Sequence, residues 1–169
     1  MPEPNPQALS VTACEQASLA VILLRRGKAA EATRALQAQR GLDLPLPGRM
    51  SAGGGDALLW NGPDRFLAVC EAGNQGLARE LGGVLDGLAY VAEASSSRSV
   101  LTVSGEWAAE MLNRLVPVDL HPRGFPLGSV ALTIAARIPL LIWRRDAGSF
   151  RLACPSSLAA SFQRRLAEL

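Results

Sequence analysis

Short apolar runs of strand length alternate with segments of helical spacing along the chain. The first two runs, VTACEQ (residues 11–16) and SLAVILLRR (18–26), are rich in aliphatic and β-branched residues, as strands are. Residues 28–40 are mostly helix formers. They stop at Gly41, the residue type favoured just past a helix C-terminus. The chain therefore opens with a predicted strand, a second strand and a helix.

The same order of segments recurs further along. The sequence NGPD (61–64) separates two apolar runs and predicts a hairpin turn. Apolar residues return to helical spacing in three later segments, 74–88, 106–116 and 156–169. Repeated strand–strand–helix units contain the β-α-β-β-α-β order of split βαβ folds. We therefore predict an α+β fold, a mainly antiparallel sheet with packed helices.

Chain length and the positions of glycine and proline predict the domain organisation. A chain of 169 residues is expected to form a single domain, residues 1–169, large enough to bury a core without disulfides. Residues 1–9 are expected to be a flexible N-terminal arm. Residues 45–56 (PLPGRMSAGGGD) contain two prolines and four glycines and predict a loop.

Charge and cysteine usage exclude several classes of protein. The net charge is only +2, from 17 basic and 15 acidic residues, and no basic stripe for nucleic acid is present. Cys14, Cys70 and Cys154 are far apart and form no C-x-x-C pair, which suits a reducing compartment. The N-terminus lacks signal-peptide character, and the apolar stretch Leu19–Leu24 is too short to span a membrane. We expect a cytoplasmic protein that binds neither nucleic acid nor membrane.

Two groups of residues resemble ligand-binding motifs, but neither has the pattern that such a motif requires. The glycine run SAGGGD (51–56) lacks the G-K-[ST] ending of a phosphate loop, so no cofactor-binding residue is predicted there. The arginine pairs at 25–26, 144–145 and 164–165 lie on separate elements. We expect them to be solvated or to form salt bridges with partners.

The segment PVDLHPRGFPLGS (117–129) contains the only histidine, His121, two residues after Asp119. A hydrolase could use this pair, but the chain has no G-x-S-x-G motif. One histidine without paired acids or cysteines also makes no metal site. We therefore predict no catalytic and no metal-binding residue.

Prolines stiffen the same segment. Each fixes its own φ and biases the preceding residue towards extended geometry. A stiff loop loses little entropy on docking, and Arg and aromatic residues are common interface anchors. The predicted partner interface is His121, Pro122, Arg123 and Phe125, together with Arg144. The alternative is that Phe125 fills the core of its own domain.

Several motifs resemble the gamma subunit of heterotetrameric sarcosine oxidase. The most specific is D-L-H-P-R-x-F-P at residues 119–126, and W-x-G-P-D occupies residues 60–64. To these are added G-S-x-A-x-T at 128–133, L-I-W-R at 141–144 and S-F at 161–162. The resemblance covers residues 10–169, although the N-terminal third is similar only in pattern.

The resemblance implies a structural role without chemistry of its own. In that family the complex oxidatively demethylates sarcosine to glycine, releases hydrogen peroxide and passes a one-carbon unit to tetrahydrofolate. FAD, FMN, NAD and tetrahydrofolate are expected in the alpha and beta subunits, zinc in delta, and no cofactor in this chain. The partners implied are the alpha, beta and delta subunits, and the fold implied is the folate-binding fold of the glycine-cleavage T-protein.

A second interpretation is a free-standing folate or one-carbon binding module related to the T-protein. The loop would then line a pocket, with Arg123 or Arg144 on the ligand's carboxylates. The segment SAGGGD and the serines at 95–97 do not match the family, so a complex with another N-methyl amino-acid oxidase stays open.

Overall fold

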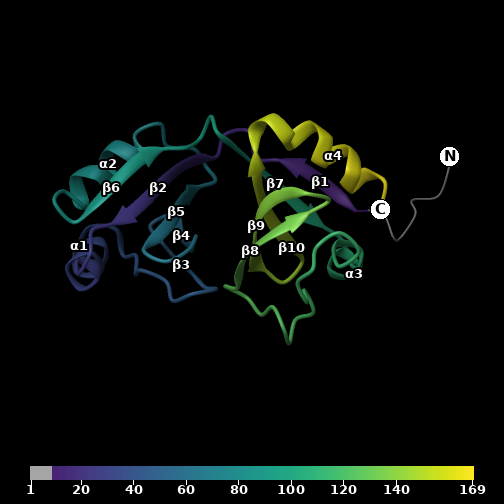
Figure 1. The fold of residues 1–169 in the computed structure, drawn as a ribbon, viewed down its shortest axis with the longest axis horizontal. Helices are drawn as coiled ribbons and strands as arrows, with labels where there is room; N and C mark the ends of the chain where they lie inside the picture. The colour runs from purple at the N-terminus through teal and green to yellow at the C-terminus, as the bar shows by residue number, and fades with distance from the viewer. Residues whose placement is uncertain (1–8) are drawn as a thin grey trace. The chain divides into compact units, whose positions relative to one another are not determined.

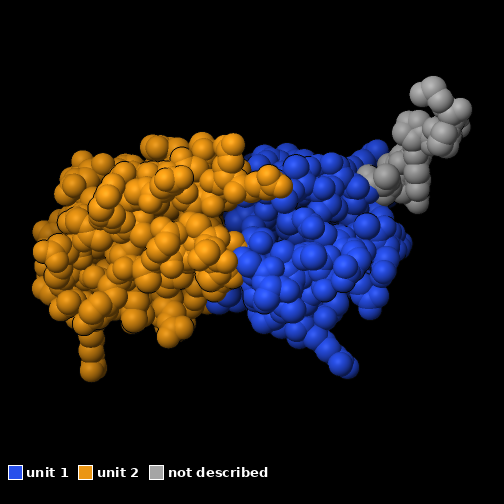
Figure 2. Space-filling view, turned by 90° about the horizontal axis from the view of Figure 1, so that it is seen from above, with its two compact units in different colours: residues 1–14, 99–169 blue, residues 15–98 orange. Residues whose placement is uncertain are grey.

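The structure is a computed structural model, and it describes residues 9–169. The predicted N-terminal arm, residues 1–9, therefore lies outside the described residues except for Leu9, which packs against one of two hydrophobic cores. Contacts group the chain into two compact units (Figure 2). Unit 2 is Glu15–Arg98, and unit 1 is Ser99–Leu169 with the residues up to Cys14. The single domain expected from chain length thus contains two units.

Unit 2 is one antiparallel sheet with two helices (Figure 1). Its elements are β2 (Ser18–Leu24), α1 (Ala29–Arg40), β3 (Met50–Gly53), β4 (Asp56–Trp60), β5 (Arg65–Cys70), α2 (Leu77–Val84) and β6 (Ala89–Glu93). The strand order is β3-β4-β5-β2-β6, and every pairing is antiparallel. Apart from the extra strand β3, this is the predicted split βαβ arrangement.

Unit 1 is a second five-stranded sheet with its own helices (Figure 1). Its elements are β1 (Ser10–Ala13), β7 (Arg98–Ser104), α3 (Ala108–Leu112), β8 (Val130–Ala135), β9 (Ile138–Asp146), β10 (Ser149–Pro155) and α4 (Ala159–Ala167), the last preceded by a 3-10 turn at Ser156–Leu158. The strand order is β1-β7-β10-β9-β8.

The two units repeat one topology. In chain order, β2, α1, β3, β4, β5, α2 and β6 of unit 2 correspond to β7, α3, β8, β9, β10, α4 and β1 of unit 1. The last strand is the exception in chain order. In unit 2 it is β6, which follows α2, whereas in unit 1 it is β1, which precedes unit 2 in the chain and pairs antiparallel with β7. The α+β class and the repeated strand–strand–helix pattern are confirmed.

Each unit buries its helices against its sheet. In unit 2, Leu36 of α1 and Leu81 of α2 are fully buried together with Ile22 of β2. In unit 1, Leu112 of α3 and Phe162 of α4 are fully buried over their sheet. No helix in the described part of the chain is long and apolar enough to cross a membrane.

The segment 45–56 differs from the predicted loop. Its second half forms strand β3, which pairs with β4 through the register Gly53↔Asp56. Gly54 and Gly55, at φ 61° and 90°, make the tight turn between these strands. Consecutive positive φ values suit a two-residue hairpin turn, so these glycines connect two strands and do not form a flexible linker.

Gly53 is expected to be intolerant of alanine, because an added Cβ would lie 2.2 Å from the carbonyl oxygen of Gly41. The hairpin packs against the backbone that ends α1, and relieving this clash should cost about 1–3 kcal/mol of unfolding free energy. Gly82→Ala is the matched control. It lies in α2 with nothing within 4 Å of an added Cβ, and should gain up to about 1 kcal/mol. Urea unfolding measures both, and a neutral Gly53→Ala would contradict this packing.

Candidate functional site

The proline-rich loop of unit 1 joins α3 to β8 and is folded by its own polar groups. Asn113 Oδ1 accepts a hydrogen bond from the Leu120 N–H at 3.2 Å, and Asp119 Oδ1 accepts one from the His121 N–H at 3.0 Å. The His121 carbonyl accepts from the N–H groups of Gly124 and Phe125 at 2.9 and 2.8 Å. The loop therefore contains a compact, hydrogen-bonded turn where extended geometry was expected.

Gly124→Ala is expected to loosen this turn. An added Cβ would lie 2.6 Å from Asp119 Oδ2, so the carboxylate that caps the His121 N–H would have to move. We expect a loss of about 1–2 kcal/mol, the scale of one charge-assisted hydrogen bond. Gly148→Ala, in the turn after β9 with open space around its Cβ, is the control and should change little. Thermal unfolding compares the two, and equal melting temperatures would contradict the tight contact.

Phe125 is buried in the core of unit 1, with 4% of its surface exposed. Its ring centroid lies 6.4 Å from that of Phe150 on β10, in a tilted pair. Such aromatic pairs stabilise beyond the area they bury. The alternative stated for Phe125, that it fills its own core, is the one the structure supports.

Arg144 on β9 is also buried, at 7% exposure. Its Nη1 donates to the Phe125 carbonyl at 3.2 Å, and its Nη2 donates to the Ala147 carbonyl at 2.9 Å. Its guanidinium carbon lies 5.3 Å from the centroid of the Phe150 ring. Among the described residues no carboxylate pairs with it. Arg144 therefore ties the loop to β9 and to the turn after it.

That turn is set by Asp146. Its carboxylate accepts from Ser149 Oγ at 2.8 Å, from Gly148 N at 3.1 Å and from Arg151 Nη1 at 3.0 Å. Burial acts to raise the pKa of Asp146, but the Ser149 hydrogen bond and the Arg151 charge outweigh it, so the pKa lies below its usual value. An ionised Asp146 thereby positions the Ala147 carbonyl that Arg144 binds.

The other three predicted interface residues, His121, Pro122 and Arg123, are exposed. His121 Nδ1 accepts a hydrogen bond from the Arg123 N–H at 3.3 Å. The structure does not join Asp119 to the imidazole, because that carboxylate binds the backbone N–H of His121. The hydrolase interpretation thus lacks the carboxylate–imidazole contact that orients a general base.

Other routes to covalent or metal chemistry are also unsupported. Burial raises the pKa of the Cys154 thiol, and burial together with the neighbouring Asp56 carboxylate raises that of Cys70. Because the thiolate is the nucleophile, neither cysteine is activated. Among residues 9–169, no three His, Cys, Asp or Glu side chains are grouped to hold a metal ion.

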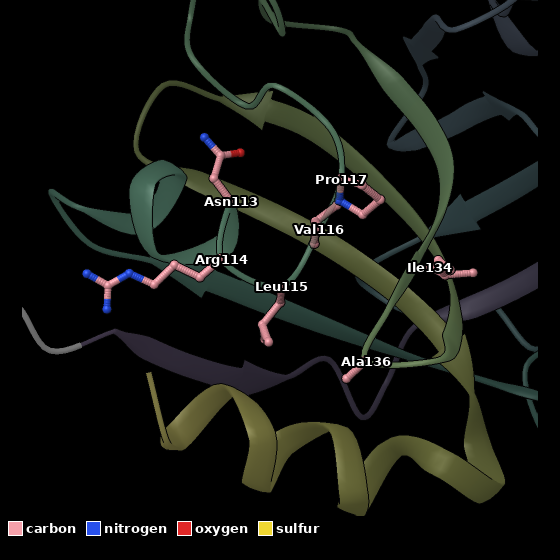
Figure 3. Close-up of a pocket in the computed structure, with 7 residues that line it drawn as sticks. All are labelled: Asn113, Arg114, Leu115, Val116, Pro117, Ile134 and Ala136. Atoms are coloured by element: carbon pink, nitrogen blue, oxygen red, sulfur yellow. The ribbon is translucent and has the colours of Figure 1, made fainter.

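Unit 1 contains a pocket of about 350 Å³ beside this loop. Figure 3 shows its lining residues at the end of α3, in the chain that follows, and near the end of β8: Asn113, Arg114, Leu115, Val116, Pro117, Ile134 and Ala136. Neither Arg123 nor Arg144, the residues expected to bind carboxylates in a folate module, lines this pocket. Sequence reasoning missed this pocket, since it depends on the packing of segments distant in the chain.

Comparison with known proteins gives the family. A sequence profile described as "Sarcosine oxidase, gamma subunit family" matches residues 26–168. The sarcosine oxidase subunit gamma of Arthrobacter sp is 44% identical over 113 residues, which cover 65% of this chain and 55% of that protein. The match thus spans about half the length of this curated relative.

Two solved structures agree in fold. A chain of the heterotetrameric sarcosine oxidase from Corynebacterium sp. U-96, in complex with pyrrole 2-carboxylate, has a TM-score of 0.86 at 31% identity over 98% of this chain and 85% of that one. The glycine cleavage system aminomethyltransferase T from Bartonella henselae has a TM-score of 0.67 at 21% identity over 95% of this chain and 46% of that one. The second likeness concerns the fold alone and confirms the T-protein-like fold. Because the family profile matches most of the chain, residues 26–168, this protein belongs to the sarcosine oxidase gamma subunit family.

Proposed function

We propose that this chain is a non-catalytic assembly subunit of a heterotetrameric, flavin-dependent sarcosine oxidase. The observation that carries the proposal is the likeness of 98% of the chain to a chain of the Corynebacterium complex at 31% identity. In this proposal alpha, beta and delta subunits bind FAD, FMN, NAD, tetrahydrofolate and zinc, and the complex converts sarcosine to glycine with release of hydrogen peroxide.

The arrangement of the proline-rich loop supports a structural role. Its two anchors, Phe125 and Arg144, are buried, and its turn is closed by backbone hydrogen bonds. This leaves His121, Pro122 and Arg123 exposed on a fixed framework. A pre-organised surface loses little entropy on binding, so these three residues are the part of the loop that we propose contacts a larger subunit.

Purification of the tagged chain from its native host tests the proposal. We expect a yellow eluate that contains larger flavin-binding partners and oxidises sarcosine. We expect the chain purified alone to be colourless and inactive. Flavin absorbance or sarcosine oxidation in the isolated chain would contradict the non-catalytic role, and a native eluate of this chain alone would contradict membership of the complex.

The folate-module interpretation is favoured by the fold alone. The T-protein likeness has 21% identity, and Arg114 is the one basic residue that lines the described pocket. Titration with tetrahydrofolate, followed by tryptophan emission, distinguishes the two functions. A saturable change in the isolated chain would favour the module.

A further inference from the structure

Strand β8 forms a free edge of its sheet. It pairs with β9 and, within the described residues, with no strand on its other side. The Arg144 N–H donates to the Ser129 carbonyl at 3.0 Å and the Arg144 carbonyl accepts from the Gly128 N–H at 2.8 Å, so Arg144 is a hydrogen-bonded position of the ladder, with Gly128 and Ser129 opposite it. Such pairs alternate along an antiparallel ladder. The inward-bonded residues of β8 are therefore Ala131, Thr133 and Ala135.

The intervening residues, Val130, Leu132 and Ile134, then direct their backbone N–H and C=O groups outward. The register agrees, because Ile134 lies opposite Pro139, which has no N–H to donate. The outer edge of β8 therefore offers a regular row of donors and acceptors.

Within β8 itself this edge lacks the usual protections against pairing, although a β-bulge at Gly128 and Ser129, opposite Arg144, precedes the strand. Natural edge strands commonly use charges, proline or a bulge to prevent association. The sequence of β8, VALTIA, contains no charge and no proline, and its register with β9 is unbroken. Leu132 and Ile134 are 47% and 56% exposed on the same face of the strand. An uncharged edge strand with exposed apolar side chains is a template for pairing with another chain.

The turn after β8 is unfavourable in isolation. Ala136 and Arg137 have φ values of 48° and 69°, in the left-handed region where Asn and Gly are preferred. Each such residue costs about 1 kcal/mol or more, and such strain is typical of functional positions. Ala136 lines the pocket beside Ile134, and Arg137 follows it with an exposed side chain. Asn-Gly would suit this backbone better, so the strain at Ala136 and Arg137 points to a functional role for the turn.

The one charged residue that lines the pocket is basic. Arg114 lines the pocket and is exposed, and neither Arg114 nor Arg137 forms an ion pair within the part of the chain that is described. A second copy of this chain would bring the strand VALTIA, which has no acidic residue to meet them. The surface thus fits an extended segment that is both apolar and acidic.

We propose that an extended segment of a partner subunit adds to the free edge of β8 as a further strand. An apolar side chain of that segment enters the pocket, and its carboxylates lie beside Arg114 and Arg137. Main-chain hydrogen bonds supply affinity in this mode of recognition, and the pocket supplies specificity. This inference rests on the proposed function and adds a second contact surface to the exposed loop residues His121, Pro122 and Arg123.

Two variants of the edge test the proposal in the native complex. Leu132→Pro removes an N–H that points outward and leaves the bonds to β9 intact, and proline is tolerated at such edge positions. Ile134→Glu places a like charge against the acidic segment. Each should reduce the partner subunits recovered with the tagged chain by about tenfold or more. Leu46→Glu is the control. Leu46, a 75% exposed leucine of unit 2, should leave recovery unchanged.

Hydrogen exchange supplies a readout that loss of fold cannot imitate. The amides of Leu132 and Ile134 should exchange quickly in the isolated chain and become protected in the complex, while that of Thr133 is protected in both. Wild-type recovery of both edge variants at unchanged melting temperature, or outward amides that stay unprotected in the complex, would overturn strand addition.

The outcome for the wild type separates the two proposals. If wild-type chain recovers its partners and the edge variants do too, β8 is not the interface and the proposed function stands. If wild-type chain recovers only itself, and Ile134→Glu converts a dimer to a monomer, the occupant is a second copy and both proposals are wrong.

Discussion

Phe125→Ala is expected to lower the free energy of unfolding by about 3–5 kcal/mol, the usual cost of removing a buried phenylalanine. The ring is 4% exposed and pairs with Phe150 at 6.4 Å, so its removal leaves a cavity in the core of unit 1. For a chain of this size each kcal/mol lowers the melting temperature by about 2–4 °C. The loop should also open, since Phe125 is its apolar anchor. Trypsin cleavage after the exposed Arg123 should therefore become faster.

Leu127→Ala is the matched control, because it is an apolar residue of the same loop with 52% exposure. It should change stability by no more than about 0.5 kcal/mol. If Phe125→Ala unfolds and is cleaved like Leu127→Ala, Phe125 is not an anchor of the loop, and its place as an interface residue has to be reconsidered.

Arg144→Met is expected to cost about 3 kcal/mol. The variant keeps the apolar stem and loses two charge-assisted hydrogen bonds, a buried one to the Phe125 carbonyl and a partly buried one to the carbonyl of the exposed Ala147. Each unsatisfied buried group costs about 1–3 kcal/mol. Urea unfolding of the isolated chain measures the loss. Arg114→Met, at an exposed position of the same unit, should stay near the wild-type value.

Arg144→Lys separates geometry from charge. A lysine keeps the charge but cannot reach both carbonyls with a planar fork, so it should behave like methionine. Wild-type stability of Arg144→Lys would show that the charge near the Phe150 ring matters and that the two hydrogen bonds do not.

Local patterns in the sequence predicted the elements well. Gly41 ends α1 in the left-handed conformation at φ 63°, as its place after residues 28–40 indicated. The NGPD turn joins β4 to β5, with Gly62 and Asp64 at positive φ. These features depend on residues within one or two turns of each other, and such neighbours are visible in the sequence.

Partners distant in the chain were not predictable in this way. Phe125 and Arg144 are residue types that are common at interfaces, but the same side chains can also be buried and hold a loop against its own sheet. Which role applies depends on Phe150 and on the turn carrying Ala147, and neither contact has a local signature. The free edge of β8 was not predictable for the same reason. An apolar run in the sequence does not show which backbone edge of the strand pairs with a neighbouring strand.

The place of β1 has a consequence for the order in which the protein can form during synthesis. All strands of unit 2 lie within residues 15–98, so the ribosome delivers that unit as one uninterrupted stretch. Strand β1 cannot pair until β7 has been synthesised, because Val11 pairs with Val103 on β7. The first described strand to be made is thus among the later ones to find its place, with the whole of unit 2 made in between. Grafting residues 10–14 after α4 would give unit 1 a continuous chain and should shorten this delay, because closing shorter loops costs less entropy.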